Sequence, residues 1–115
     1  MSDQQAVHDW IRQTVNNNDV VLFMKGNAKM PQCGFSAQVA QILALSGVEY
    51  TDINVLDDMS IREGVKSFTN WPTIPQLYVK GEFVGGCDII REMYEQGELQ
   101  QLFQDKGLAG STAVA

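Results

Sequence analysis

The sequence has few of the residues that build disulfide frameworks and metal sites. Its 115 residues include two cysteines, Cys33 and Cys87, and one histidine, His8. Two cysteines so far apart in the chain do not form the disulfide framework of a small secreted protein. Together with one histidine they also make a poor set of zinc ligands, so we expect no metal site built by this chain alone.

Long apolar runs are also missing. No stretch approaches the roughly 20 apolar residues of a membrane-spanning helix. The N-terminal residues have neither the basic and apolar regions of a signal peptide nor the arginine-rich character of a transit peptide. We therefore expect a cytoplasmic protein that does not interact with membranes.

Positive charge is scarce, because eight lysines and arginines stand against fourteen acids and the formal net charge is −6. This balance argues against binding to nucleic acids or to anionic membranes. Six of the acids lie from Glu82 onward, where only Arg91 and Lys106 oppose them. The first two-thirds of the chain is nearly balanced, and any anion-binding site is expected there.

Apolar side chains recur at helical spacing in several segments. We predict helices over residues 3–16, from 33 to a stop at Gly47, after a cap at Asp57 or Asp58, from about 88, and after a break at Gly97. The apolar faces comprise Val7, Trp10, Ile11, Thr14 and Val15 in the first helix, Phe35, Val39, Ile42 and Leu43 in the second, and Ile61, Val65 and Phe68 in the third; the last helix carries Leu99, Leu102 and Phe103.

Short β-branched and aromatic runs predict four strands, over residues 20–25, 48–55, 74–79 and 82–84. The first two are joined through a helix and should be parallel, whereas the last two form an antiparallel hairpin that turns at Gly81. The predicted fold is a single α/β domain over residues 1–106 with thioredoxin-like architecture, a four-stranded mixed sheet flanked by helices on both faces. Residues 107–115 are predicted to form a disordered tail.

Cys33 stands at the start of the second predicted helix, after a strand and the loop GNAKMPQ. The N–H groups and the positive dipole end of a helix lower the pKa of a thiol and favour the thiolate, which attacks disulfides and binds metals. The alternative is an inert buried cysteine. Lys25, which ends the preceding strand, favours the reactive interpretation, whereas Lys29 in the loop is expected to be a solvated surface charge.

Three positions after Cys33, where a dithiol redox site places its second cysteine, the chain has Ser36. Cys33 therefore cannot close a disulfide across this helix turn, and a mixed disulfide on it would need a second thiol from solution. His8 lies on the N-terminal helix, where we expect a surface residue and not a catalytic base for Cys33.

Two further stretches present candidate binding groups. In WPTIPQ, residues 71–76, a cis bond between Ile74 and Pro75 would free the Ile74 backbone to pair with an extended peptide, whereas the commoner trans bond would make a rigid turn. In GGCD, residues 85–88, Asp88 either caps a helix or binds a ligand. Cys87 either packs as a small apolar residue or lines the site.

The stretches MKG…PQCGFS, NWPTIPQLYV and GEFVGGCD occur in this order along the chain. With them, the sequence from about Val20 to Phe103 closely resembles the monothiol glutaredoxins of the CGFS type. The resemblance implies the glutaredoxin form of the thioredoxin-like fold, with a glutathione site beside Cys33. It further implies that glutathione is contacted by Lys25, Arg62, Ile74, Cys87 and Asp88, in a pocket shaped by Trp71 and Phe35.

The resemblance also assigns a role to each contact. Lys25 and Arg62 would hold the glycyl carboxylate of glutathione and supply the local positive charge that the acidic chain otherwise lacks. Ile74, before a cis proline, would pair its backbone with the tripeptide. Cys87 and Asp88 would hold the γ-glutamyl end.

Iron–sulfur chemistry follows from the same resemblance. A [2Fe-2S] cluster takes four thiolates, of which one chain offers Cys33 and bound glutathione offers a second. A homodimer bridged by the cluster would complete the set. Members of this family are known for this arrangement, for passing the cluster to apo iron–sulfur proteins, and for BolA-type protein partners. The implied function is cluster transfer, with weak oxidoreductase activity at most.

Two other functions remain open at this point. The same thiolate and pocket would suit a glutathione-dependent thiol–disulfide oxidoreductase that reduces protein–glutathione mixed disulfides by a monothiol mechanism. An interaction module with a silent Cys33 is the third possibility. The loop GNAKMPQ is longer than a minimal strand-to-helix turn, and in the resemblance such a loop marks the cluster-binding class.

Overall fold

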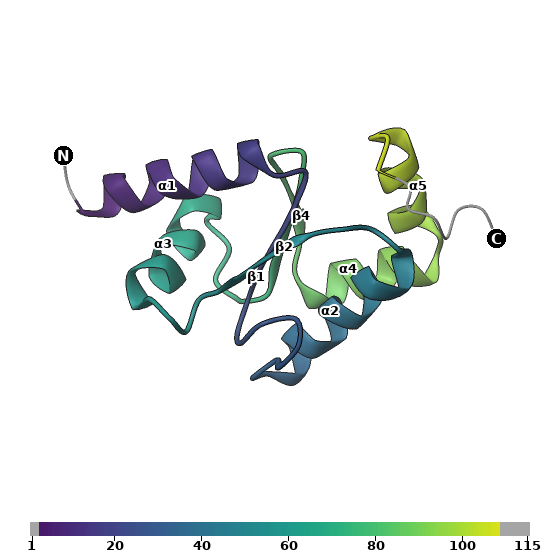
Figure 1. The fold of residues 1–115 in the computed structure, drawn as a ribbon, viewed down its shortest axis with the longest axis horizontal. Helices are drawn as coiled ribbons and strands as arrows, with labels where there is room; N and C mark the ends of the chain where they lie inside the picture. The colour runs from purple at the N-terminus through teal and green to yellow at the C-terminus, as the bar shows by residue number, and fades with distance from the viewer. Residues whose placement is uncertain (1–2, 109–115) are drawn as a thin grey trace.

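A computed structural model describes residues 3–108 and builds a sheet with helices around it (Figure 1). The helices are α1 Asp3–Asn17, α2 Gly34–Ser46, α3 Met59–Thr69, α4 Cys87–Glu95 and α5 Glu98–Asp105, and the strands are β1 Val20–Met24, β2 Thr51–Asn54, β3 Gln76–Val79 and β4 Glu82–Gly85. Every predicted helix and strand is present. The second and third strands begin later than predicted, at Thr51 and Gln76.

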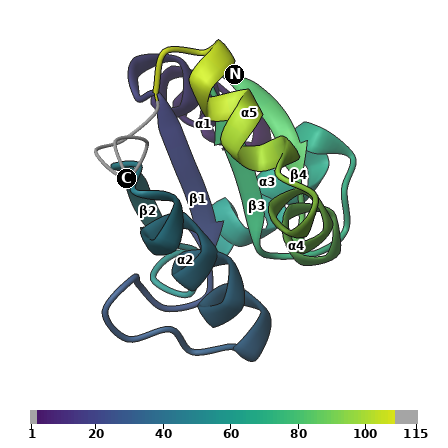
Figure 2. The ribbon, with the colours of Figure 1, turned by 90° about the vertical axis from the view of Figure 1, so that its right-hand side faces the viewer.

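The strands form one sheet in the order β2-β1-β3-β4. β1 pairs with β2 in parallel, and Leu22 lies opposite Asp52. β3 is antiparallel to both β1 and β4, so the predicted crossover and hairpin are confirmed. α1 and α3 lie on one side of the sheet and α2, α4 and α5 on the other (Figures 1 and 2). The predicted mixed sheet with helices on both faces is therefore also confirmed.

The β1 strand divides the core into two layers, because its side chains alternate between the two faces of the sheet. Val20, Leu22 and Met24 pack in the cluster under α2, α4 and α5, whereas Val21 and Phe23 pack in the cluster under α1 and α3. All five side chains are buried, as expected for a strand that helices cover on both faces. The sheet is thereby fixed on both sides, and the loops at the end of β1 extend from a rigid base.

Two predicted inward residues are exposed. Trp10 shares the helical spacing of Val7 and Ile11, yet its side chain is 42% exposed, because it lies at the flank of the helix and not over the sheet. Phe35 is 61% exposed, because the first turn of α2 extends past the end of β1. Both residues instead line hollows on the surface of the protein.

Local hydrogen bonds define the start of α3 and the end of the described chain. Of the two candidate caps for α3, Asp58 is the one used, and it accepts a hydrogen bond of 2.9 Å from the Ser60 N–H. At the other end of the chain, the Leu108 N–H donates to the Phe103 carbonyl, and Leu108 packs against the core. Residues 109–115, most of the predicted tail, lie outside the described residues. Within residues 3–108, no helix is both long and apolar enough to cross a membrane.

Helix α1 approaches α3 closely at Gly64. A Cβ atom added to this buried glycine would overlap with Cγ1 of Val7 and would also contact Ile11. Val7 is β-branched and cannot swing aside, so a side chain at residue 64 must push α1 away from α3. The missing side chain therefore sets the distance between the two helices.

Replacing Gly64 by alanine tests this close approach. We expect Gly64→Ala to lower the free energy of unfolding by about 1–3 kcal/mol through overpacking, measured by urea denaturation. Gly34→Ala is the matched control, because a Cβ there meets nothing within 4 Å. In that variant alanine's higher helix propensity should leave stability unchanged or raise it by up to about 1 kcal/mol. Equal effects at the two positions would contradict the packing argument.

Candidate functional site

Cys33 is the residue that caps the N-terminus of α2. Its backbone is extended, with φ −153° and ψ 137°, and its carbonyl accepts the first hydrogen bond of the helix from Ala37 at 2.9 Å. Burial of the thiol raises its pKa, but the backbone N–H groups of Ser36 and Phe35 and the charge of Lys25 lower it more, so the pKa lies below its ordinary value. The half-buried thiol is thus set up to ionise, as predicted.

Ser36 occupies the position of the absent second cysteine and has a structural role of its own. It is fully buried, and its Oγ accepts a hydrogen bond of 3.0 Å from the backbone N–H of Lys25. The same hydroxyl contributes to the lowered pKa of Cys33. One side chain therefore ties the end of β1 to the first turn of α2, and it brings Lys25 close to the thiol as predicted.

The loop of residues 26–32 is closed on itself. Gly26 forms a β-bridge with Pro31, and the Gln32 N–H donates to the Lys25 carbonyl at 2.8 Å. Strand β2 holds the loop from the side, because Asn54 accepts a hydrogen bond from the Gly26 N–H at 2.9 Å. Lys29 is exposed, as predicted.

A cavity of about 340 Å³ lies between the first turn of α2, the 71–75 turn and the start of α4. Three of the predicted glutathione-contacting residues, Ile74, Cys87 and Asp88, line it together. Phe35 and Trp71, which were expected to shape the pocket, line it as well. The Ile74–Pro75 peptide bond is cis, the form implied by the family resemblance and not the commoner trans form.

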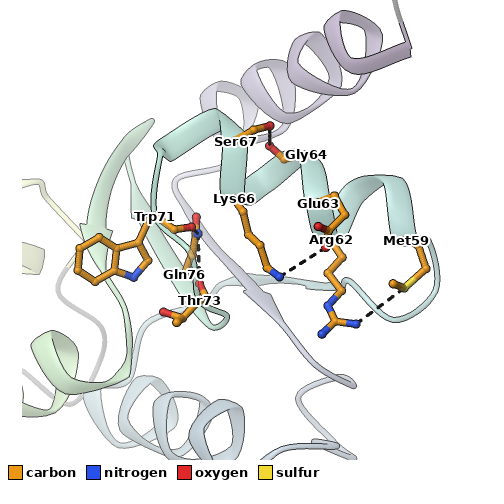
Figure 3. Close-up of polar contacts among 9 residues, drawn as sticks. All are labelled: Met59, Arg62, Glu63, Gly64, Lys66, Ser67, Trp71, Thr73 and Gln76. Atoms are coloured by element: carbon orange, nitrogen blue, oxygen red, sulfur yellow. Dashed lines mark hydrogen bonds and ion pairs between the residues drawn. The ribbon is translucent and has the colours of Figure 1, made fainter.

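The turn of residues 71–75, which forms one wall of the cavity, is held by Gln76. Gln76 is fully buried, and sequence reasoning missed its role. Its Nε2 donates to the carbonyls of Trp71 at 3.1 Å and Thr73 at 3.2 Å (Figure 3). Its Oε1 accepts from the hydroxyls of Thr69 and Tyr78, both at 3.2 Å. Gln76 thus fixes the loop before β3 to the end of α3, and its polar character inside a buried strand was the available signal.

Arg62 extends from α3 on the side away from α1 (Figure 3). Its Nη1 lies 4.0 Å from Met59 Sδ, and its buried Nε has no partner among the described residues. Lys66, one turn further along α3, pairs with Glu63 at 3.4 Å. Arg62 is not among the residues that line the cavity, so the structure groups it with neither Ile74 nor Asp88. Cys33 and Lys25 do not line the cavity either; Cys33 lies beside it, close enough to Cys87 for its charge to act on that thiol.

The second cysteine lies at the start of α4. Cys87 Sγ donates to Gln38 Oε1 at 3.0 Å, and both cysteines are free thiols. Burial raises the pKa of the Cys87 thiol; Arg91 opposes this, and the charges of Asp88 and Cys33 add to it. Cys87 is therefore the less reactive thiol, close enough to Cys33 to sense its charge.

Of the other titratable groups, His8 does not line the cavity, whereas Asp88 does. His8 was expected at the surface, but it is half-buried and packs against α3, where Nε2 lies 2.7 Å from Ser67 Oγ and the ring contacts Phe68 edge-on. Asp88 pairs with Arg91 at 3.3 Å and is largely exposed. Across residues 3–108, no group of three His, Cys, Asp or Glu side chains could hold a metal ion.

Comparisons with known proteins agree with this geometry. The glutaredoxin family model matches residues 20–84. A probable monothiol glutaredoxin 2 of Rickettsia typhi is 55% identical over 97 residues, which are 84% of this chain and 87% of that protein. Reduced poplar apo GrxS14 superposes with a TM-score of 0.75 at 45% identity, over 84% of this chain and 89% of that one.

A more distant structure shares the fold. The buckwheat glutaredoxin–glutathione complex superposes with a TM-score of 0.82 at 24% identity, over 96% of this chain and 99% of that one. The family match and the high identity to a monothiol relative extend over the strand, the Cys33 loop and the 71–76 turn. This chain therefore belongs to the glutaredoxin family and, within it, is similar to the monothiol glutaredoxins.

Proposed function

We propose that this chain binds a [2Fe-2S] cluster with glutathione, as a homodimer, and transfers it to apo-proteins. The observation that carries the proposal is a single thiol of lowered pKa at a helix N-terminus, with a buried serine where a second cysteine would close a disulfide. Such a thiol can donate one thiolate to iron but cannot resolve its own mixed disulfide.

The number of ligands supports a shared cluster. One chain supplies one suitable thiolate, because the other cysteine has a raised pKa and its thiol donates to Gln38. Two chains and two glutathione molecules supply the four thiolates that the cluster takes. Glutathione ligands exchange with thiols of other proteins, which favours delivery of the cluster to apo iron–sulfur proteins, with a BolA-type protein as the expected accessory partner.

The cavity beside the thiol supports the glutathione part. Its size is within the range of small-ligand sites, and the turn before β3 brings the backbone of Ile74 to its wall. Glutathione is an anion, and Lys25 lies close enough to Cys33 to stabilise a thiolate there. The buried Nε of Arg62 has no hydrogen-bond partner within residues 3–108, which suits this residue to a carboxylate that approaches α3.

Reduction of glutathione mixed disulfides is the second candidate function. The lowered pKa of Cys33 suits a nucleophile as well as a metal ligand. The two functions differ in what the assembled species contains. A cluster carrier forms a coloured dimer with bound glutathione, whereas a reductase works as a colourless monomer that consumes reduced glutathione.

Cys33→Ser is the direct test of the cluster proposal. After anaerobic reconstitution with iron, sulfide and glutathione, the wild-type protein should show visible charge-transfer absorption in a species of dimer mass. The serine variant should stay colourless and monomeric, because it lacks the thiolate. Cys87→Ser is the control and should keep the colour. A coloured dimer formed by the Cys33→Ser variant would contradict the proposal.

Lys25→Ala tests the glutathione site. Loss of a charge-assisted hydrogen bond should weaken glutathione binding by about 1–3 kcal/mol, measured by calorimetry. Lys29→Ala removes the same charge from an exposed position in the adjoining loop and should leave the affinity unchanged. Equal affinities for wild type and Lys25→Ala would place the anion site elsewhere.

The two thiols should differ in the pH dependence of alkylation. Iodoacetamide reacts with the thiolate, so a lower pKa moves the midpoint of the rate profile to lower pH. We expect the midpoint of Cys33 below that of an ordinary cysteine and the midpoint of Cys87 above it. Ser36→Ala should move the Cys33 midpoint upward, and mass spectrometry of each labelled peptide distinguishes the two sites. A Cys33 midpoint above that of Cys87 would show that the helix start does not stabilise the thiolate.

A further inference from the structure

Another large hollow lies away from the cavity beside Cys33. It has a volume of about 610 Å³ and is formed by α1, β2 and the start of α3. None of the residues that line it also lines the cavity beside the thiol. We call it the α1–β2–α3 groove after these elements. Its apolar lining includes Val7, Trp10, Ile53 and Ile61.

The groove is elongated. It continues into a second hollow of about 370 Å³ along α1 and α3, and the two hollows share Val7 and Ser60. Gly64, where α1 approaches α3 closely, lines the second hollow. An elongated apolar hollow suits a segment of polypeptide better than a compact small molecule.

Trp10 contributes a large, partly exposed aromatic side chain to the groove. Its indole is 42% exposed, while its neighbours on the helix, Ile11 and Val15, are almost fully buried in the core. A large aromatic side chain at the mouth of an apolar groove is the typical anchor of a protein interface. Its place in the lining of the groove therefore makes Trp10 the candidate anchor for a partner.

The border of the groove is acidic and unneutralised. Asp52, Asp57 and Asp58 line it, and no lysine or arginine does. None of the three forms an ion pair with a described residue, although Asp9, Asp19 and other acids of the chain do. Their partners are amide and hydroxyl groups, which leave the negative charge in place.

This charge determines what can bind. Nucleic acids and anionic lipid surfaces are repelled by three uncompensated carboxylates beside the groove. A polypeptide with apolar side chains flanked by lysine or arginine matches both the floor and the border. A second copy of this chain is a poor match, because its net charge is −6.

We propose that the α1–β2–α3 groove docks a basic, apolar segment of a partner protein, with Trp10 as the central contact. The proposal goes beyond the proposed cluster function, because the groove shares no lining residue with the cavity beside Cys33. A partner held here leaves the thiol free. The surface would therefore select which proteins are brought to the thiol without taking part in its chemistry.

The test uses three synthetic helical peptides and the full chain labelled with ¹⁵N. The first peptide alternates lysine and leucine at helical spacing, the second replaces lysine by glutamate, and the third replaces leucine by alanine. We expect the lysine–leucine peptide to shift the amide resonances of the groove, and binding to weaken with added salt. The other two peptides should bind at least about tenfold more weakly, since each lacks one of the two matching features.

Variants assign the binding to the groove. Trp10→Ala should weaken binding at least about tenfold through loss of the anchor, and Asp57→Lys by about fivefold or more through charge reversal. Glu98→Lys, on α5, makes the same change in net charge at an exposed position outside the groove and should stay within about twofold of wild type. Cys33→Ser should bind like wild type, so this result stands even if the cluster proposal fails.

Four outcomes of the peptide titrations would overturn the proposal. They are resonance shifts centred on the Cys33 face, equal binding of the glutamate peptide, equal losses in Asp57→Lys and Glu98→Lys, and no binding of any peptide. Light scattering of the apo-protein tests whether a second copy of the chain occupies the groove instead. An apo dimer that Trp10→Ala converts to monomer would assign the groove to a second copy of the chain and also overturn the proposal. Circular dichroism confirms that each variant is folded before it is titrated.

Discussion

The hydrogen bond from the Lys25 backbone to the Ser36 hydroxyl joins the sheet to the reactive thiol. It fixes the first turn of α2 to the last residues of β1, the strand that two helical layers hold in place. Without it, the helix start that stabilises the Cys33 thiolate could shift relative to the strand end that carries Lys25. A buried hydroxyl with no partner would also cost free energy, so the bond stabilises both the fold and the site.

The opposite wall of the site is fixed in the same way. In the described part of the chain only three polar residues are fully buried: Ser36, Ser46 and Gln76. Two of these three hold the two walls, Ser36 at the thiol and Gln76 at the turn of residues 71–75. Buried polar groups that are fully hydrogen-bonded fix a local geometry, and here they hold the first turn of α2 and the turn of residues 71–75.

Periodicity and short apolar runs were sufficient to predict the order of helices and strands, because the helices have one apolar face and the central strand β1 is apolar on both. It could not say where the sheet ends, so Trp10 and Phe35 were assigned to apolar faces although both are exposed. The motifs predicted that Ile74, Cys87 and Asp88 would lie together, and they share one cavity. The hydrogen bonds of Gln76 could not be predicted, because they join residues whose contact depends on how α3 ends against β3.

Gly26 determines how the chain tolerates substitution around the thiol. Its φ of +85° disfavours any side chain, and an added Cβ would collide with the backbone of Met30 and Gln32, which cannot move aside. Gly34, directly beside Cys33, faces open space. In a saturation mutagenesis experiment, sensitivity would therefore not decline smoothly with distance from the thiol. Gly34, the neighbour of the thiol, should tolerate substitution, whereas Gly26, seven residues before Cys33 at the start of the loop, should not.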